Sequence, residues 1–229
     1  MHTLAVKGAP HLDARLAAAA SLVLPGGTVA DIGCDHGKLT AYLACTGNHD
    51  RIIAADLRPS PLESAKQTCL QAGCSHKVEF RLGDGLQVLQ PGEAQSIVLA
   101  GVSALTTIQI IQQAPWVFAP GVRLVLVPAT KPELLRQWLW EQGFALVEER
   151  LVQAAGRWYV VMGAEYTGQP SSHSLLECYL GPEGAKPQAR AYREHLLQRL
   201  RKHRKGLEAD PARAAEIDQL LLALQQLQE

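Results

Sequence analysis

The sequence predicts an α/β protein in which a mostly parallel sheet of seven strands precedes a C-terminal helical hairpin. Three observations favour this fold class. Short apolar segments alternate with segments of helical periodicity over residues 28–142. The first two apolar segments end in an aspartate, and the third runs into Gly-Asp-Gly. After residue 167 the chain becomes polar, helical in pattern and rich in Lys and Arg. Alternating strands and helices indicate a parallel sheet with right-handed crossovers.

Apolar spacing and helix-ending residues place the elements of the first part in order. A helix is predicted over residues 11–24, where Pro25-Gly26-Gly27 ends it. Strands are predicted at 28–32, 51–56, 78–82, 96–100 and 122–127. The helices between and after them are predicted at 38–46, 59–72 with Pro61 as the alternative start, 104–114 and 132–142. Two further strands, 144–151 and 158–165, have no helix between them, which predicts an antiparallel hairpin at one edge of the sheet.

The last part of the chain predicts a separate helical unit, so the domains are expected at 1–167 and 168–229. Residues 185–207 and 212–228 both carry apolar residues at helical spacing. Between them, Asp210 is suited to cap a helix and Pro211 to occupy its first position. Two amphipathic arms with a short break predict an antiparallel, coiled-coil hairpin.

Composition narrows the class of protein. The chain has 229 residues, of which 47% are apolar and 19% charged, so it can bury a sizeable core. It has no apolar run of about 18 residues, so we expect no membrane span. Residues 1–7 lack the order of a signal peptide. The five cysteines show no zinc-ribbon spacing and are odd in number, so we expect no metal and a reduced, cytoplasmic setting.

The loop over residues 31–37, Asp-Ile-Gly-Cys-Asp-His-Gly, is the predicted ligand-binding corner. It follows the first strand, and open α/β sheets bind small molecules beyond the carboxyl ends of their strands. Gly33 lets a ligand approach the backbone. Asp56 lies where an acid takes the ribose hydroxyls of an adenosine, and Asp84 can accept the adenine amino group.

Asp35 decides between two classes of cofactor. It replaces the second glycine of a dinucleotide fingerprint, and its carboxylate would repel a pyrophosphate. The same carboxylate is acceptable beside a sulfonium cation, which favours S-adenosylmethionine over a nicotinamide dinucleotide. Purely structural or binding roles remain open for three residues. Asp35 could only hydrogen-bond the glycine loop or the amino group of the cofactor, His36 could be structural, and Cys34 could simply fill space near the ligand.

The second feature is a strongly basic arm on an otherwise neutral chain. Residues 1–165 hold 13 Lys/Arg and 14 Asp/Glu, whereas residues 186–205 hold eight Lys/Arg and one acid. This density favours contacts with the phosphates of a folded RNA over a merely solvated helix face. The predicted RNA-binding residues are Lys186, Arg190, Arg193, Arg199, Arg201, Lys202, Arg204 and Lys205.

Several stretches resemble the TrmK family. They are residues 12–16 (Leu-Asp-Ala-Arg-Leu), 29–36, 83–86, 123–128, 135–139 and 156–159 (Gly-Arg-Trp-Tyr). That family methylates N1 of the adenine at position 22 in the D-arm of bacterial tRNA. It has a Rossmann-like class I methyltransferase domain and a C-terminal coiled-coil extension. The resemblance implies S-adenosyl-L-methionine as cofactor, tRNA as partner and Asp35 as the catalytic residue. The implied cofactor residues are Asp31, Gly33, Cys34, His36, Asp56, Leu57, Gly83, Asp84, Gly85, Ala100 and Arg15.

The chain departs from the family at the ends of the fourth and fifth strands. The family has Ala-Gly-Met-Gly-Gly where residues 100–104 are Ala-Gly-Val-Ser-Ala, and Gln-Pro-Asn where residues 127–129 are Val-Pro-Ala. We expect these strand ends to face the acceptor base, so two alternatives stay open: adenine-N1 methylation of tRNA, or a cofactor- and RNA-binding paralogue with lost or altered acceptor specificity. The sequence also leaves a homodimer open.

Overall fold

A computed structural model describes residues 8–47 and 49–227. The chain divides into two compact units, one ending at Ser171 and the other beginning at Ser172. This division falls close to the composition change from which the domain boundary at residues 167–168 was predicted. Within the described ranges, no helix combines the length and the apolar character that a membrane span requires.

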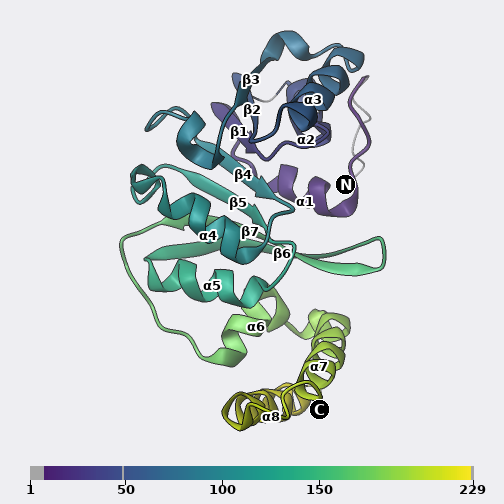
Figure 1. Ribbon diagram of the computed structural model, residues 1–229, viewed down its shortest axis with the longest axis vertical. Coiled ribbons are helices and arrows are strands. Elements are labelled where there is room, and N and C mark those ends of the chain that lie inside the picture. Colours follow the sequence, from purple (N-terminus) through teal and green to yellow (C-terminus); the bar gives the residue numbers. More distant parts are fainter. Residues whose placement is uncertain (1–7, 48, 228–229) are drawn as a thin grey trace. The chain divides into compact units, whose positions relative to one another are not determined.

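The first unit is built on one sheet of seven strands in the order β3-β2-β1-β4-β5-β7-β6 (Figure 1). Strands β1 to β5 are parallel, while β7 runs antiparallel to both β5 and β6. The predicted mixed sheet is therefore confirmed. The strands are β1 (Thr28–Ile32), β2 (Arg51–Asp56), β3 (Val78–Leu82), β4 (Ser96–Ala100), β5 (Arg123–Val127), β6 (Phe144–Ala154) and β7 (Arg157–Tyr166).

Helices cover both faces of this sheet (Figure 1). The first three contact one another in sequence, and α4 contacts α5. Asp13 begins the first helix, because its Oδ1 accepts a hydrogen bond from the Leu16 amide at 2.9 Å, so this helix starts three residues later than predicted. The helices are α1 (Ala14–Leu22), α2 (Lys38–Thr46), α3 (Pro59–Gln71), α4 (Ala104–Gln112) and α5 (Pro132–Glu141), with 3₁₀ turns η1 (Ser75–Lys77), η2 (Gly85–Val88) and η3 (Pro115–Val117).

The central strands form the core. Every residue of β5 is buried, and so are Val29, Ile53 and Ile97 in the neighbouring strands. Strands buried on both faces read as continuous apolar runs, which is why they could be located from the sequence. The core also encloses one ion pair, in which Arg136 Nε donates to Glu149 Oε2 at 2.7 Å and both side chains are fully buried.

The hairpin of β6 and β7 is longer than predicted and extends past the ends of the parallel strands (Figure 1). Leu126, the penultimate residue of β5, pairs with Met162. The residues of β7 that precede Met162, including Tyr159, therefore continue beyond the carboxyl end of β5. Val152 of β6 pairs with Tyr159 and extends the ladder in the same direction. This places the hairpin tip at the edge of the sheet where ligands bind in open α/β folds.

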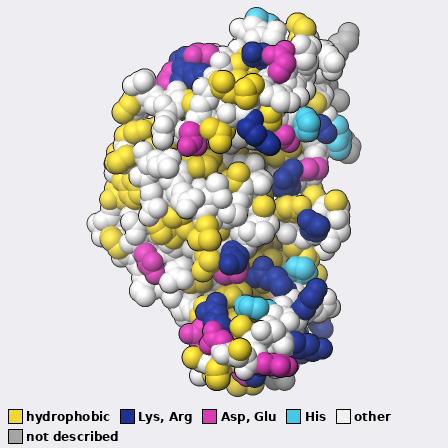
Figure 2. All heavy atoms as spheres, viewed as in Figure 1, with side chains coloured by type: hydrophobic (Ala, Val, Ile, Leu, Met, Phe, Trp, Pro, Cys, Tyr) yellow, Lys and Arg dark blue, Asp and Glu magenta, His cyan; other side chains and the backbone are white. Residues whose placement is uncertain are grey.

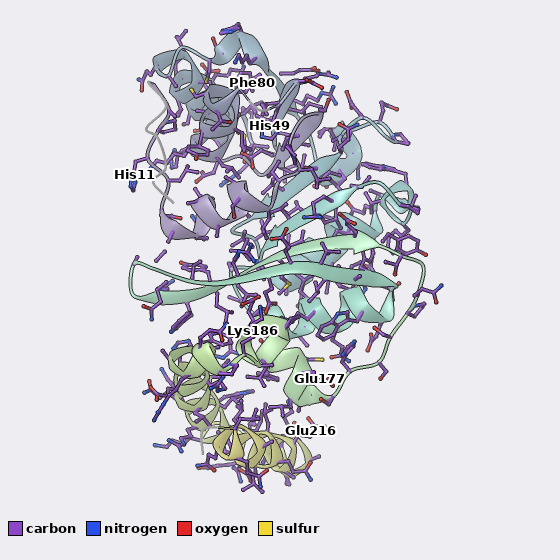
Figure 3. All side chains as sticks on the ribbon, turned by 180° about the vertical axis from the view of Figure 1, so that it is seen from behind. His11, His49, Phe80, Glu177, Lys186 and Glu216 are labelled. Atoms are coloured by element: carbon purple, nitrogen blue, oxygen red, sulfur yellow. The ribbon has the colours of Figure 1, made fainter. Side chains whose placement is uncertain are left out.

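The second unit consists of α6 (Leu175–Gly184), η4 (Pro187–Ala189), α7 (Arg190–Arg204) and α8 (Pro211–Gln226). Ser174 and Glu177 close a capping box at the start of α6, and Glu177 is labelled in Figure 3. Asp210 caps α8 as predicted, with its Oδ1 accepting from the Arg213 amide at 3.0 Å. The predicted first arm is not continuous, because η4 separates its beginning from α7.

Helices α7 and α8 contact each other through apolar stripes. Leu196 and Leu200 are buried on α7, and Leu220 and Leu224 are buried on α8. The two predicted helical arms are thus confirmed, while a coiled-coil geometry for them stays a prediction. Gln228, the predicted last residue of the second arm, lies outside the described residues.

Candidate functional site

One cavity of about 760 Å³ opens at the carboxyl ends of β1 to β4. Every residue implied in cofactor binding lines it, and so does Asp35. The structure therefore brings together side chains that are up to 85 positions apart in the sequence, from Arg15 on α1 to Ala100 at the end of β4. The cavity has the volume of a small-molecule site.

The corner loop between β1 and α2 uses its own N–H groups for structure. The amides of Gly33 and Cys34 donate to the Ala55 carbonyl at 2.8 and 3.0 Å. The Asp35 amide points to Asp56 Oδ2 at 3.4 Å, and the Gly37 amide donates to the Cys34 carbonyl at 2.8 Å. A phosphate-binding loop needs its N–H groups free to face the ligand. This corner therefore holds its shape without an anion and offers few donors to a diphosphate.

Gly33 leaves open space on the ligand side of that loop. Its φ is +75°, and a Cβ built on it would meet no atom of the chain within 4 Å. Gly33 lines the cavity, so this space is where a ligand can approach the backbone. Gly37 differs, because a Cβ there would come within 2.7 Å of Ala65 on α3. The first glycine thus gives access to the cavity, and the second permits close packing of the loop against α3.

Asp31 is a carboxyl group held at the start of α2. Its side chain is buried, and its Oδ2 accepts a hydrogen bond from Thr40 Oγ1 at 2.6 Å. Burial raises the pKa of Asp31 to about 6, and the neighbouring Asp56 adds to the rise, although the bonds from Thr40 oppose it. An acid already occupies the helix N-terminus, which is the position where a nucleotide phosphate binds in other nucleotide-binding corners.

The other two acids stand at the ends of the next strands. Asp56 is buried, and its Oδ1 accepts from the Arg58 amide at 3.0 Å. Asp84 is exposed at the cavity wall. Leu57 lies beside them with 62% of its surface exposed, an unusual exposure for a leucine that lines a cavity. Together the acids and Leu57 form a strip that suits the hydroxyls, amino group and flat face of an adenosine.

Gly83 and Gly85 line the cavity, but packing explains why they are glycines. A Cβ on Gly83 would lie 2.6 Å from Val88 Cγ1, and one on Gly85 would lie 3.1 Å from Ile110 Cγ2. These contacts hold η2 and α4 close to the end of β3. The two glycines therefore shape the wall rather than clear space for the ligand.

Asp35 and His36 project from the corner. Their side chains are 66% and 69% exposed, and Asp35 Oδ2 lies 3.8 Å from His36 Nε2. Asp35 has a φ of +48°, which is uncommon for a residue with a side chain. The His36 carbonyl accepts from Thr68 Oγ1 at 2.7 Å, so the corner is anchored to α3 at this point.

Cys34 is buried between these features. Burial raises the pKa of its thiol far above the ordinary value, and Asp31 and Asp56 raise it further. The thiol is therefore neutral and unreactive at physiological pH. This environment fits the space-filling role that the sequence left open.

The residues that depart from the family pattern mostly serve the fold. Ser103 caps α4, accepting from the Thr106 amide at 3.1 Å. Ala104 and Val127 are buried, and the Ala129 amide donates to the Val102 carbonyl at 2.8 Å. Of the altered residues, Val102 lines the cavity, whereas residues 103–104 and 127–129 do not. The expectation that both strand ends face the acceptor base stays a prediction.

One polar wall of the cavity was not predicted from the sequence. Thr106, Gln109 and Gln113 of the α4 region line it and are exposed. Their spacing of three and four residues places them on one face of a helix. That spacing is the signal that could have identified them, but the neighbouring apolar residues of α4 dominate the pattern.

The second unit carries the basic arm, and the structure corrects the role predicted for Arg193 in this arm. Arg193 is buried and donates to the carbonyls of Gly184, Lys186 and Pro187 at 3.1, 2.6 and 3.3 Å. It closes the turn between α6 and α7, so the prediction that Arg193 binds RNA is wrong. Lys186, labelled in Figure 3, lies at that turn and pairs with Glu183 at 2.6 Å.

The remaining arm residues differ in how their charge is used. Arg190 pairs with Glu194 at 3.1 Å, Arg204 pairs with Asp218 at 2.9 Å, and the Arg199 guanidinium lies 5.7 Å from the centre of the Tyr179 ring. Figure 2 shows many Lys and Arg side chains over the C-terminal helices. Three exposed cations of the basic arm have no ion pair within the described part of the chain: Arg201, Lys202 and Lys205.

Comparison with known proteins agrees with this geometry. A family model described as a methyltransferase domain matches residues 12–162. A tRNA (adenine(22)-N(1))-methyltransferase of Bacillus subtilis strain 168 is 29% identical over 223 residues, which cover 94% of this chain and 92% of that protein. The crystal structure of the B. subtilis m1A22 tRNA methyltransferase TrmK has a TM-score of 0.82 at 24% identity, covering 96% of this chain and 99% of that one.

A third likeness comes from a Streptococcus pneumoniae protein crystallised with S-adenosyl-L-methionine. It has a TM-score of 0.79 at 24% identity and covers 96% of this chain and 100% of that chain. The family model spans well over half of the present sequence, and the B. subtilis relative matches nearly all of it. The chain therefore belongs to the methyltransferase domain family, and it is similar over nearly its whole length to the tRNA (adenine(22)-N(1))-methyltransferase of B. subtilis.

Proposed function

We propose that this protein uses S-adenosyl-L-methionine to methylate N1 of an adenine in tRNA, at position 22 of the D-arm. The observation that carries the proposal is the corner over residues 31–37, where the amides of residues 33, 34, 35 and 37 bond within the chain while Asp31, Asp56 and Asp84 line the adjoining cavity. Such a site suits a cationic nucleoside and disfavours a diphosphate. The B. subtilis relative, named for the same reaction, supports the choice of acceptor.

The residues of the cavity fit this cofactor part by part. Asp56 is placed to accept the ribose hydroxyls, and Asp84 to accept the adenine amino group. Gly33 gives the clearance that lets the ligand lie against the backbone. Asp31 presents a carboxylate to the ammonium of the methionine part, and Arg15 presents a guanidinium to its carboxylate. When bound, the cofactor supplies an electrophilic methyl group on a sulfonium.

The chain's own contribution to the reaction is alignment and charge. N1 of adenine has a lone pair, so no general base is required to make it a nucleophile. The methylated ring is a cation, and an acid beside it stabilises the charge as it develops. Asp35 suits this role, because its carboxylate is exposed at the cavity and is not engaged by a strong ion pair. The remaining acceleration comes from holding acceptor and donor in line.

The polar face of α4 suits the approach of a base. Gln109 and Gln113 offer amide groups that can both donate to and accept from a nucleobase edge. The target adenine must leave its stack to reach the cavity. The cations Arg201, Lys202 and Lys205 of the second unit are suited to hold the tRNA through its phosphates. All five cysteines are free, which suits the reducing cytoplasm where tRNA is found.

A methyl-transfer assay tests the proposal. The full chain, an unmodified tRNA transcript and methyl-labelled cofactor should yield 1-methyladenosine after digestion to nucleosides. A matched transcript with guanine in place of adenine 22 should accept no label. Label in a different nucleoside, or equal labelling of both transcripts, would show that the proposed acceptor is wrong.

A variant tests the role of Asp35. Asp35→Asn keeps the size of the side chain but removes its charge, so we expect kcat to fall about 100-fold. Calorimetric affinity for the cofactor should change less than about threefold, because Asp31, Asp56 and Asp84 remain. Unchanged kcat would assign Asp35 to the loop structure alone.

A further inference from the structure

Two of the family-like stretches have no role in the nucleoside part of the site. They are residues 12–16, which contain Arg15, and residues 156–159, which contain Tyr159. These stretches are separated by most of the first unit, yet they meet in the structure. The Arg15 guanidinium carbon lies 5.4 Å from the centre of the Tyr159 ring. That distance is within the range of a cation–π interaction.

The Arg15 guanidinium occupies a seat with three sides. The Tyr159 ring forms one side, and Asp13 forms another, with its Oδ2 at 3.4 Å from Arg15 Nη2. Gly101 at the end of β4 forms the third, because a Cβ there would lie 3.5 Å from Arg15 Nη1. Residues from α1, β7 and the end of β4 thus converge on one cation.

The seat leaves hydrogen-bond donors turned to the cavity. Arg15 lines the cavity, and its side chain is 26% exposed. Apart from Asp13, no residue in the described part of the chain accepts a hydrogen bond from the guanidinium. A guanidinium has five N–H donors in a planar fork that matches a carboxylate. The free edge of Arg15 therefore fits an anionic group of the ligand.

The order of the strands indicates which group this is. Asp84 follows β3 and Asp56 ends β2, so the proposed adenine and ribose lie over β3 and β2. The rest of the ligand then extends over β1 and β4, where Gly101 and Arg15 lie. The amino-acid part of the cofactor carries the one carboxylate of the molecule, and it arrives at this end.

We infer that Tyr159 is a positioning residue for cofactor binding. Its ring holds the Arg15 guanidinium at the β4 end of the cavity, where the guanidinium binds the carboxylate of the methionine part. A long arginine side chain loses rotamer freedom when it binds, and a ring that has already fixed it lowers that loss. This inference rests on the proposed function, and it gives a role to the part of β7 that extends past the end of β5.

Calorimetry on the full chain without tRNA tests the inference with two probes. The first is S-adenosylmethionine, and the second is its decarboxylated form, which keeps the sulfonium and the ammonium. Tyr159→Leu should weaken the affinity for S-adenosylmethionine about three- to tenfold, as expected for a lost cation–π contact. It should leave the affinity for the decarboxylated probe unchanged. Tyr159→Phe keeps a ring and should retain the wild-type preference.

Two controls separate positioning from folding. Arg15→Met removes the charge but not the length, so it should abolish the preference between the probes whatever stands at position 159. Tyr166→Leu removes an aromatic residue from the same strand, where it contacts Phe118 and Phe144, and should leave the preference intact. In steady-state assays with tRNA, Tyr159→Leu should raise KM for the cofactor and leave kcat nearly unchanged.

The outcomes distinguish the inference from the proposed function. A wild-type chain that binds neither probe would remove the proposed function. A wild-type chain that binds both probes equally, or a Tyr159→Leu variant that weakens both equally, would overturn the inference alone. The inference would also fail if Tyr159→Leu kept full cofactor affinity but bound tRNA less tightly, because the Arg15 seat would then serve a phosphate of the RNA.

Discussion

Replacing Asp31 by asparagine should stabilise the protein while weakening its hold on the cofactor. Asp31 is a buried carboxyl group whose pKa is raised from 3.8 to about 6, mainly by burial. At pH 8 the group is ionised in both the folded and the unfolded chain, and the folded chain bears the desolvation of that charge. Asparagine has nearly the same shape, and its oxygen can still accept from Thr40 Oγ1.

The size of the stabilisation by Asp31→Asn follows from the shift in the pKa of Asp31. A difference of about 2 pKa units corresponds to about 3 kcal/mol at 1.36 kcal/mol per unit. Because the pKa of Asp31 is higher in the folded chain than in the unfolded chain, the folded chain binds the proton more tightly. The desolvation penalty of the ionised carboxylate is therefore absent below the unfolded pKa and complete above the folded pKa. The stabilisation by Asp31→Asn should therefore be about 3 kcal/mol at pH 8 and about half of that at pH 5.

Urea unfolding of both proteins at pH 5 and pH 8 measures this difference. Calorimetry should show the opposite trend for ligand binding, with the variant losing affinity because the carboxylate no longer faces the ammonium. Wild-type affinity should likewise fall as the pH drops through about 6 and Asp31 becomes protonated. A stability difference that is the same at both pH values would refute the reasoning, since desolvation of the ionised form could not then be its cause.

Two further predictions concern the corner loop and the arm. Gly33→Ala and Gly47→Ala both place alanine at a φ above +70° with no chain atom near its Cβ, so each should lower the free energy of unfolding by about 1 kcal/mol in urea. Only Gly33→Ala should weaken cofactor binding in calorimetry. Equal cofactor affinities of the two variants would contradict the proposed clearance at Gly33. Replacing the three unpaired arm cations by serine should lower the slope of log Kd for tRNA against log salt by about 2. A control with serine at Lys66, Lys77 and Arg213 should keep the wild-type slope. If the arm variant also keeps the wild-type slope, the arm is not part of the RNA interface. The three cations are Arg201, Lys202 and Lys205.

Much of the catalytic unit could be predicted because its signals are local. Buried parallel strands appear as apolar runs, and the acids at the carboxyl ends of β1, β2 and β3 must meet because parallel strands end at one edge. Asp31, Asp56 and Asp84 therefore needed no knowledge of packing to be grouped. All three line the cavity in the structure.

The rest depended on contacts between distant residues. Nothing local in Arg193 distinguishes it from the solvated cations around it, and its burial becomes evident only when the carbonyls of the preceding turn close around it. Ser103 departs from a family glycine, and its hydroxyl caps α4, a role that the comparison of motifs did not indicate. The seat of Arg15 joins three separate elements, and a one-dimensional pattern carries no record of such a meeting.

The corner over residues 31–37 also bears on which molecules this protein ignores. Cells contain many adenosine compounds, and most of the abundant ones carry phosphates, as ATP and NAD do. A pocket that read only the adenosine would be filled by them. Because Ala55 and Asp56 already occupy the loop amides, such a competitor would bury its phosphates without donors and beside fixed negative charge. The loop thus contributes to the choice of methyl donor by disfavouring adenosine compounds that carry phosphates.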